Sequence, residues 1–61
     1  MNTKLIKIRS IERGLTIKEI ALKLDINEQT ITNWINGRNL DNISKFIKLL
    51  DYLQINIKEI K

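Results

Sequence analysis

The feature that most constrains this sequence is a pair of short helix patterns between Thr16 and Gly37, separated by very few residues. The first pattern begins with a capping box. In this motif Thr16 accepts a hydrogen bond from the backbone N–H of Glu19, and the Glu19 side chain accepts one from the backbone N–H of Thr16. Apolar residues then recur at the spacing of one helix face; they are Ile17, Ile20, Ala21 and Leu24. We therefore predict a helix that begins at Thr16 and buries one face.

A second helix follows after a turn of three residues, Asp25 to Asn27. Aspartate enters the left-handed backbone region at a lower cost than most residues, so we expect the turn to begin at Asp25. Asn27 suits the N-cap of the second helix, and Gly37 suits the left-handed position just beyond its end. The sequence thus predicts a helix over about Glu28–Asn36.

This second helix has two faces of different composition. Ile31, Trp34 and Ile35 fall three and four residues apart and are expected to point inward. The opposite face is polar and nearly uncharged; it carries Glu28, Gln29, Thr32, Asn33 and Asn36. Short amides and hydroxyls are weak helix formers, so helix stability does not explain their presence.

The same side chains are suited to the edges of DNA bases. A Gln or Asn amide can pair with adenine, Thr can contact thymine, and Glu can accept from the cytosine amino group. We therefore predict a helix-turn-helix whose second helix contacts bases; the predicted base-contacting residues are Glu28, Gln29, Thr32 and Asn33. A capped helical hairpin on the surface of a small bundle remains an alternative at this point.

The charge of the chain fits a polyanionic partner. Eleven Lys and Arg against seven Asp and Glu give a net charge of +4. Basic residues are expected to flank the polar face, where they would contact phosphates while the face contacts bases; these flanking residues are Lys18, Arg38, Lys45 and Lys48.

Length and composition exclude other classes of protein. A chain of 61 residues is expected to form one domain over residues 1–61, with a small core. It contains no cysteine and no histidine, and its acids form no pair in an apolar setting, so we expect no enzyme, metal site or cofactor. No small-molecule substrate is evident. The sequence contains neither a signal-peptide core nor a stretch long enough to span a membrane, and we expect a cytoplasmic protein.

The other segments are expected to support this pair of helices. A first helix over about Thr3–Arg13 should place Leu5, Ile8 and Ile11 inward and end at Gly14, and Leu15 should enter the core. A long helix from Asn42 to about Leu53, capped by Asp41 or Asn42, has an apolar row; this row is Ile43, Phe46, Ile47, Leu50 and Leu53. Asn56 and Glu59 resemble a second capping box, which would begin a short helix with Ile57 and Ile60 inside. The fold class predicted is an all-α, compact bundle of five short helices.

At this point the sequence resembles the DNA-binding domain of the phage repressor and Cro family, also called the xenobiotic-response-element family. The matching runs cover nearly the whole chain; they are Gly14-Leu15-Thr16, Glu19-Ile20-Ala21, Leu24-Asp25-Ile26-Asn27, Thr30-Ile31, Trp34-Ile35-Asn36-Gly37 and Ile55-Asn56-Ile57-Lys58-Glu59-Ile60. The resemblance implies a lambda-repressor-like globule whose third helix lies in the major groove of double-stranded DNA, usually in a repressor. The positions expected at the DNA backbone are Thr16, Lys18, Asn27, Asn36, Arg38 and Asn39.

Several positions depart from the family pattern. Ile17 stands where Gln is common, so the phosphate-supporting role of that Gln cannot be carried over. Ser10 and Ile35 replace an Arg–Glu ion pair, and an apolar contact in place of a partly buried pair is often neutral or stabilising. Gln54 stands where a helix-ending glycine is usual, so a slightly strained turn is expected there.

The expected partner is double-stranded DNA, bound by two copies of the chain. A weak homodimer on a palindromic operator would double the contacts of one small domain, with half-sites ~10 bp apart. The expected dimer surface is the carboxy-terminal region around Tyr52, Ile55, Ile57 and Ile60. In the alternative, these isoleucines close the core of a monomer. An antitoxin or a protein-docking module on the same scaffold is the alternative function.

Overall fold

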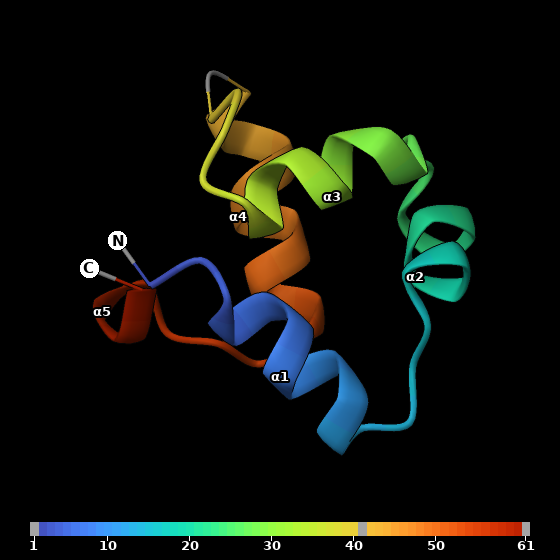
Figure 1. The fold of residues 1–61 in the computed structure, drawn as a ribbon, viewed down its shortest axis with the longest axis horizontal. Helices are drawn as coiled ribbons and strands as arrows, with labels where there is room; N and C mark the ends of the chain where they lie inside the picture. Colours follow the sequence, from blue (N-terminus) through green and yellow to red (C-terminus); the bar gives the residue numbers. More distant parts are fainter. Residues whose placement is uncertain (1, 41, 61) are drawn as a thin grey trace.

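The computed structural model describes residues 2–40 and 42–60, and these residues form five helices and no strand (Figure 1). The helices are α1 (Leu5–Glu12), α2 (Ile17–Leu24), α3 (Glu28–Ile35), α4 (Ile43–Tyr52) and α5 (Ile57–Ile60). The predicted all-α architecture with five short helices is confirmed. None of the described helices is both long enough and apolar enough to cross a membrane.

The core is centred on Trp34, which joins α3 to α4. Its ring meets that of Phe46 edge-to-face, with centroids 5.5 Å apart, and both side chains are completely buried. The indole N–H donates to the carbonyl oxygen of Asn39 at 3.0 Å, so the one polar atom of this large side chain is satisfied. The predicted inward face of α3, formed by Ile31, Trp34 and Ile35, is confirmed.

The predicted inner row of α1 is wrong at two of its three residues; Leu5 is half-buried and packs against the core. Ile8 and Ile11 are 51% and 67% exposed, whereas Ile6 and Ser10 are buried. The Ser10 hydroxyl donates to the carbonyl oxygen of Ile6 at 2.7 Å, so this serine enters the core with its polar group satisfied. Because a polar residue occupies the buried face of α1, the spacing of its apolar residues predicts that a different face is turned to the core. The helix also begins at Leu5, two residues after the predicted start.

The apolar rows of α4 and α5 also differ in part from the prediction. Phe46, Leu50 and Leu53 are buried as expected, together with Leu49, but Ile43 and Ile47 are exposed. In α5 Ile60 is buried, while Ile57 is 39% exposed. Asn42 makes no side-chain capping bond to α4, and Asp41 lies outside the described residues. Leu15 is half-buried and packs against the core.

Left-handed backbone ends two helices where the sequence indicates it. Gly14 has φ +68° after α1, and Gly37 has φ +73° after α3, a region that glycine enters without steric cost. Gln54 takes φ +57°, which costs more for a residue with a Cβ, as expected from its departure from the family pattern. Its side chain accepts a hydrogen bond from Arg13 at 3.0 Å, so it also helps to hold α1.

Hydrogen bonds and one ion pair, made by α1 and the residues on either side of it, fasten the two ends of the chain together. The Arg13 Nε donates to the carbonyl oxygen of Leu53 at 3.1 Å, and the Arg9 guanidinium pairs with Glu59 at 3.0 Å. The backbone N–H of Asn2 donates to the carbonyl oxygen of Ile60. Thr3 is buried, and its hydroxyl donates to the carbonyl oxygen of Ile35 at 3.1 Å. The first and last turns of the chain therefore support both each other and the end of α3.

Glu59 is the acidic residue at the centre of this junction. Its carboxylate accepts from the backbone N–H of Asn56 at 2.9 Å, and the Asn56 side chain accepts from the backbone N–H of Lys58 at 2.9 Å. The predicted capping pair of α5 is thus present. The backbone hydrogen bond from Asn56, followed by the bond from Arg9, holds the pKa of Glu59 below its ordinary value of 4.5.

We predict that Glu59 contributes to the acid sensitivity of folding. Because its pKa is lowered in the folded chain, its contribution is present above about pH 4.5 and is lost as the pH falls through the folded value. Thermal melts of Glu59→Gln and the native chain should differ most near neutral pH and converge as the pH falls below about 4.5. Asp51→Asn, at an exposed residue of α4, controls for the loss of one negative charge. A constant difference across this range would contradict the prediction.

Candidate nucleic-acid interface

Hydrogen bonds cap the starts of both α2 and α3, and a left-handed residue ends α2. The Thr16 hydroxyl accepts from the backbone N–H of Glu19 at 3.1 Å, and Glu19 accepts from the backbone N–H of Thr16 at 3.2 Å, so the predicted capping box is present. Asp25 takes the predicted left-handed conformation with φ 56° and ψ 48°. Asn27 caps α3 by accepting from the backbone N–H of Gln29 at 2.8 Å. Asp25 and Asn27 shape the turn from α2 into α3, whereas the capping box fixes the start of α2.

The outward side of α3 carries two amides that are bonded to each other. Gln29 Nε2 donates to Asn33 Oδ1 at 3.1 Å, one helical turn apart, and we call these two side chains the amide pair. Gln29 is exposed, and Asn33 is half-buried. Glu28 is exposed at the start of the helix, and Thr32 is half-buried beside the pair. The four predicted base-contacting residues therefore belong to one element.

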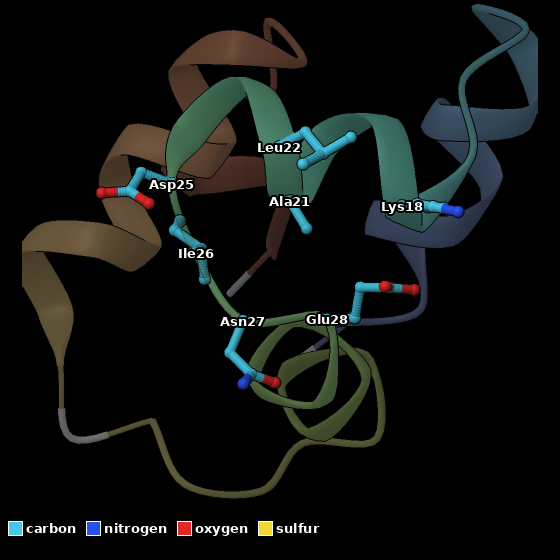
Figure 2. Close-up of a pocket in the computed structure, with 7 residues that line it drawn as sticks. All are labelled: Lys18, Ala21, Leu22, Asp25, Ile26, Asn27 and Glu28. Carbon is cyan, nitrogen blue, oxygen red and sulfur yellow. The ribbon is translucent and has the colours of Figure 1, made fainter.

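A hollow of about 410 Å³ lies between α2 and the beginning of α3 (Figure 2). Lys18 borders it from α2, and Asn27 and Glu28 border it from the turn and from α3, with Ala21 and Ile26 also among its lining residues. Figure 2 shows Lys18 and Glu28 on the same side of this hollow. Two predicted backbone-contacting residues, Lys18 and Asn27, thus lie next to the start of the predicted base-contacting helix.

Two of the predicted backbone-contacting residues already use hydrogen-bond donors within the chain. Both the backbone N–H and the hydroxyl of Thr16 donate to the Glu19 carboxylate, the hydroxyl at 3.0 Å. A phosphate at Thr16 would therefore have to displace a carboxylate. Asn36 donates from its side-chain amide to the carbonyl oxygen of Thr32 at 3.1 Å, which ties this side chain to the last turn of α3.

The loop after α3 carries two of the residues predicted to contact the DNA backbone. Arg38 is exposed, and its backbone N–H donates to the carbonyl oxygen of Asn33 at 2.7 Å, which ties the loop to α3. Asn39 is also exposed and takes φ 54°, while its carbonyl oxygen receives the indole N–H of Trp34. Lys45 and Lys48 are exposed on α4. The two loop residues are therefore held by the core, although their side chains face solvent.

Two of the four residues predicted to form the dimer surface are buried in the single chain. Ile55 and Ile60 are 3% and 0% exposed, because they close the core of the single chain. Neither can offer surface to a second copy while the chain keeps this packing. Tyr52 is half-buried and Ile57 is exposed, and Ile57 lines a hollow between α4 and α5 together with Ile47 and Leu50. The surface at this end is thus smaller than expected and lies partly on α4.

Sequence reasoning missed two features of this region. The bond between Gln29 and Asn33 was signalled by their four-residue spacing, since amides so placed on a helix can meet. The capping box at Thr16 was predicted, but not its consequence that Glu19 occupies the Thr16 donors that a phosphate would need. Within the described residues, no group of three His, Cys, Asp or Glu side chains is placed to hold a metal ion.

Comparison with protein-family models gives a match to a helix-turn-helix family over residues 5–60, which includes all five helices. Proteins of this family are regulators that bind DNA. Neither the search of curated proteins nor the search of solved structures found a match.

Proposed function

The chain belongs to this helix-turn-helix family, and we propose that it binds double-stranded DNA at specific sequences through α3. The observation that carries the proposal is the amide pair on the outward side of a helix whose start is fixed by the capped turn. Helix-turn-helix proteins place the second helix of the motif in the major groove, where base edges present distinct hydrogen-bonding patterns.

The amide pair favours adenine as one of the bases contacted. Each amide has an oxygen acceptor and an NH₂ donor, and the bond between Gln29 and Asn33 uses one of each. Whichever of the two amides donates in that bond, one oxygen and one NH₂ group remain for a ligand. Adenine presents an N7 acceptor and an N6 donor in the major groove, which match these two groups. The internal bond also restricts both side chains before DNA arrives, which lowers the entropy lost on binding.

Phosphate contacts are proposed for the basic and amide residues around this surface. Lys18 and Arg38 lie before and after α3 in the chain and can neutralise phosphates on either side of it. Asn27, Asn36 and Asn39 are exposed and can donate to phosphate oxygens, since the Asn36 NH₂ group has a second hydrogen beside the one given to Thr32. Thr16 would contribute least to phosphate binding, because its donors are bonded to Glu19.

We propose that the protein represses transcription by occupying promoter DNA, and that it does so in the cytoplasm. The alternative is a docking module on the same scaffold. A titration with DNA from its own upstream region, with unrelated DNA as competitor, distinguishes them. Selective retention of the upstream DNA supports the proposal, and equal binding to both DNAs or to neither contradicts it.

The first prediction for this function concerns the amide pair. Gln29→Ala should cost roughly 1–3 kcal/mol of binding free energy on the cognate site and relax the preference at one A·T pair. Binding to random DNA should change little, because the amide does not contribute to phosphate contacts. Thr30→Ala, on the same helix but outside the predicted base-contacting set, is the matched control. Equal losses on cognate and random DNA would remove Gln29 from that set.

A second prediction concerns phosphate contact by the loop after α3. Arg38→Ala should weaken binding to all DNA sequences alike and reduce the slope of log affinity against log salt by about one unit, because one counterion fewer is released. Lys58→Ala removes a positive charge from the exposed side of α5 and should leave the slope unchanged. A loss that depends on sequence, with an unaltered slope, would argue against the assignment of Arg38.

We also propose that two copies bind a palindromic operator as a weak homodimer. One domain of this size contacts few base pairs, whereas a two-fold pair doubles the contacts at half-sites ~10 bp apart. With Ile55 and Ile60 buried, the pairing surface would consist of Tyr52, Ile57 and the neighbouring Ile47. Such an area is small, so the dimer is expected to be weak in solution and to tighten on DNA.

Sedimentation and footprinting on an isolated operator test this pairing. Two chains per operator and two protected half-sites are expected, and Ile57→Ser should shift the stoichiometry toward one. Leu22→Ser, which removes an exposed apolar side chain from α2, should leave the stoichiometry at two. A single chain on a single protected half-site at saturation would exclude the dimer.

A further inference from the structure

The outward side of α1 carries apolar residues that neither the core nor the proposed DNA contact uses. Ile8 and Ile11 lie one turn apart on this helix and are 51% and 67% exposed. Ile6 and Ser10 occupy the side of α1 that faces the core, so Ile8 and Ile11 are not buried within the chain. Exposed apolar side chains that are adjacent to each other commonly mark a surface where a partner binds.

A hollow of about 390 Å³ accompanies these two isoleucines. Ile35 and Asn36, at the end of α3, form part of its lining. The bond from the buried Thr3 hydroxyl to the carbonyl oxygen of Ile35 holds the end of α3 against the residues that precede α1. The hollow therefore has one wall on α1 and another on α3, and both walls are fixed by contacts of the folded chain.

Every charged residue that lines this hollow, among the described residues, is basic. Lys4 and Lys7 line it together with the two isoleucines, and no carboxylate is among its lining residues. The other two hollows differ: the one between α2 and α3 includes Asp25 and Glu28 beside Lys18, and the one between α4 and α5 includes Asp51 and no basic residue. A partner that fits the hollow on α1 must therefore combine apolar side chains with negative charge.

We propose that this hollow, lined by Lys4, Lys7, Ile8 and Ile11 of the first helix and its N-cap, is a docking site for an acidic amphipathic helix of a partner protein. Its apolar side chains would cover Ile8 and Ile11, and its carboxylates would pair with the two lysines. A helix that docks in a groove presents its apolar anchors at positions i, i+3, i+4 and i+7, so its own apolar row would lie along Ile8 and Ile11. The proposal goes beyond DNA binding, and its test requires no DNA.

The test uses the ¹⁵N-labelled chain and a synthetic helical peptide of ~15 residues that has leucines at i, i+3, i+4 and i+7 and glutamates on both flanks. Saturable changes in amide chemical shift should be confined to α1 and the end of α3. A second peptide, with glutamine in place of every glutamate, should bind at least about fivefold more weakly, because it lacks the two charge pairs. Shifts centred on Leu22, or on the hollow between α4 and α5, would overturn the proposal, as would the absence of any shift.

Two sets of variants separate the apolar contribution from the charged one. The double variant Ile8→Ser, Ile11→Ser should lose binding of both peptides, while its thermal melt stays close to that of the native chain because both positions are exposed. Leu22→Ser is the matched control, since Leu22 is 76% exposed but lies on α2, and it should bind like the native chain.

The second set is the double variant Lys4→Gln, Lys7→Gln, which should weaken binding of the glutamate peptide and leave binding of the glutamine peptide unchanged. Equal affinity for the two peptides in the native chain would overturn the acidic character of the partner. Concentration-dependent shifts of α1 without any peptide would indicate that a second copy of the chain covers this surface instead, and this outcome would also overturn the proposal.

Discussion

The burial of Trp34 is the interaction on which the rest of the structure depends. Its ring lies against Phe46 of α4, and its indole N–H reaches the carbonyl oxygen of Asn39, so one side chain joins α3, α4 and the loop between them. Because α3 is only eight residues long, it would be marginal in isolation. Its helical form and its orientation are therefore set by this packing, with the capped turn fixing the other end.

The helix-turn-helix was predictable because its signals are local. The capping box at Thr16, the left-handed Asp25 and the N-cap at Asn27 each concern residues within a few positions, and each is present in the structure. The inward face of α3 was predictable for the same reason. The predicted contacts with bases and phosphates remain predictions, since they depend on a partner and not on the fold of the chain.

The prediction for α1 failed because a polar residue occupies part of its buried face, whereas in α4 the buried face includes Leu49 and leaves Ile43 and Ile47 exposed. The sequence of α1 contains two rows that could face the core, and the spacing of apolar residues alone predicted the one with Ile8 and Ile11. The other row includes Ser10, whose hydroxyl can be satisfied inside its own helix, and the long-range bonds from Arg9 and Arg13 to the end of the chain orient α1 accordingly. Such bonds join residues 40 or more positions apart and leave no local pattern.

The bond between Asn2 and Ile60 also has a consequence for the architecture around the domain. Because the first and last described turns touch, any polypeptide continued from either end departs from one small area beside α5, whereas α2 lies on the other side of the view and α3 extends across the top toward it (Figure 1). A reporter or a second module could be joined there by a short linker without covering the start of α3, which lies far from the termini (Figure 1). The same proximity makes the domain suited to circular permutation, in which the old ends are fused and new ends are opened in an exposed loop.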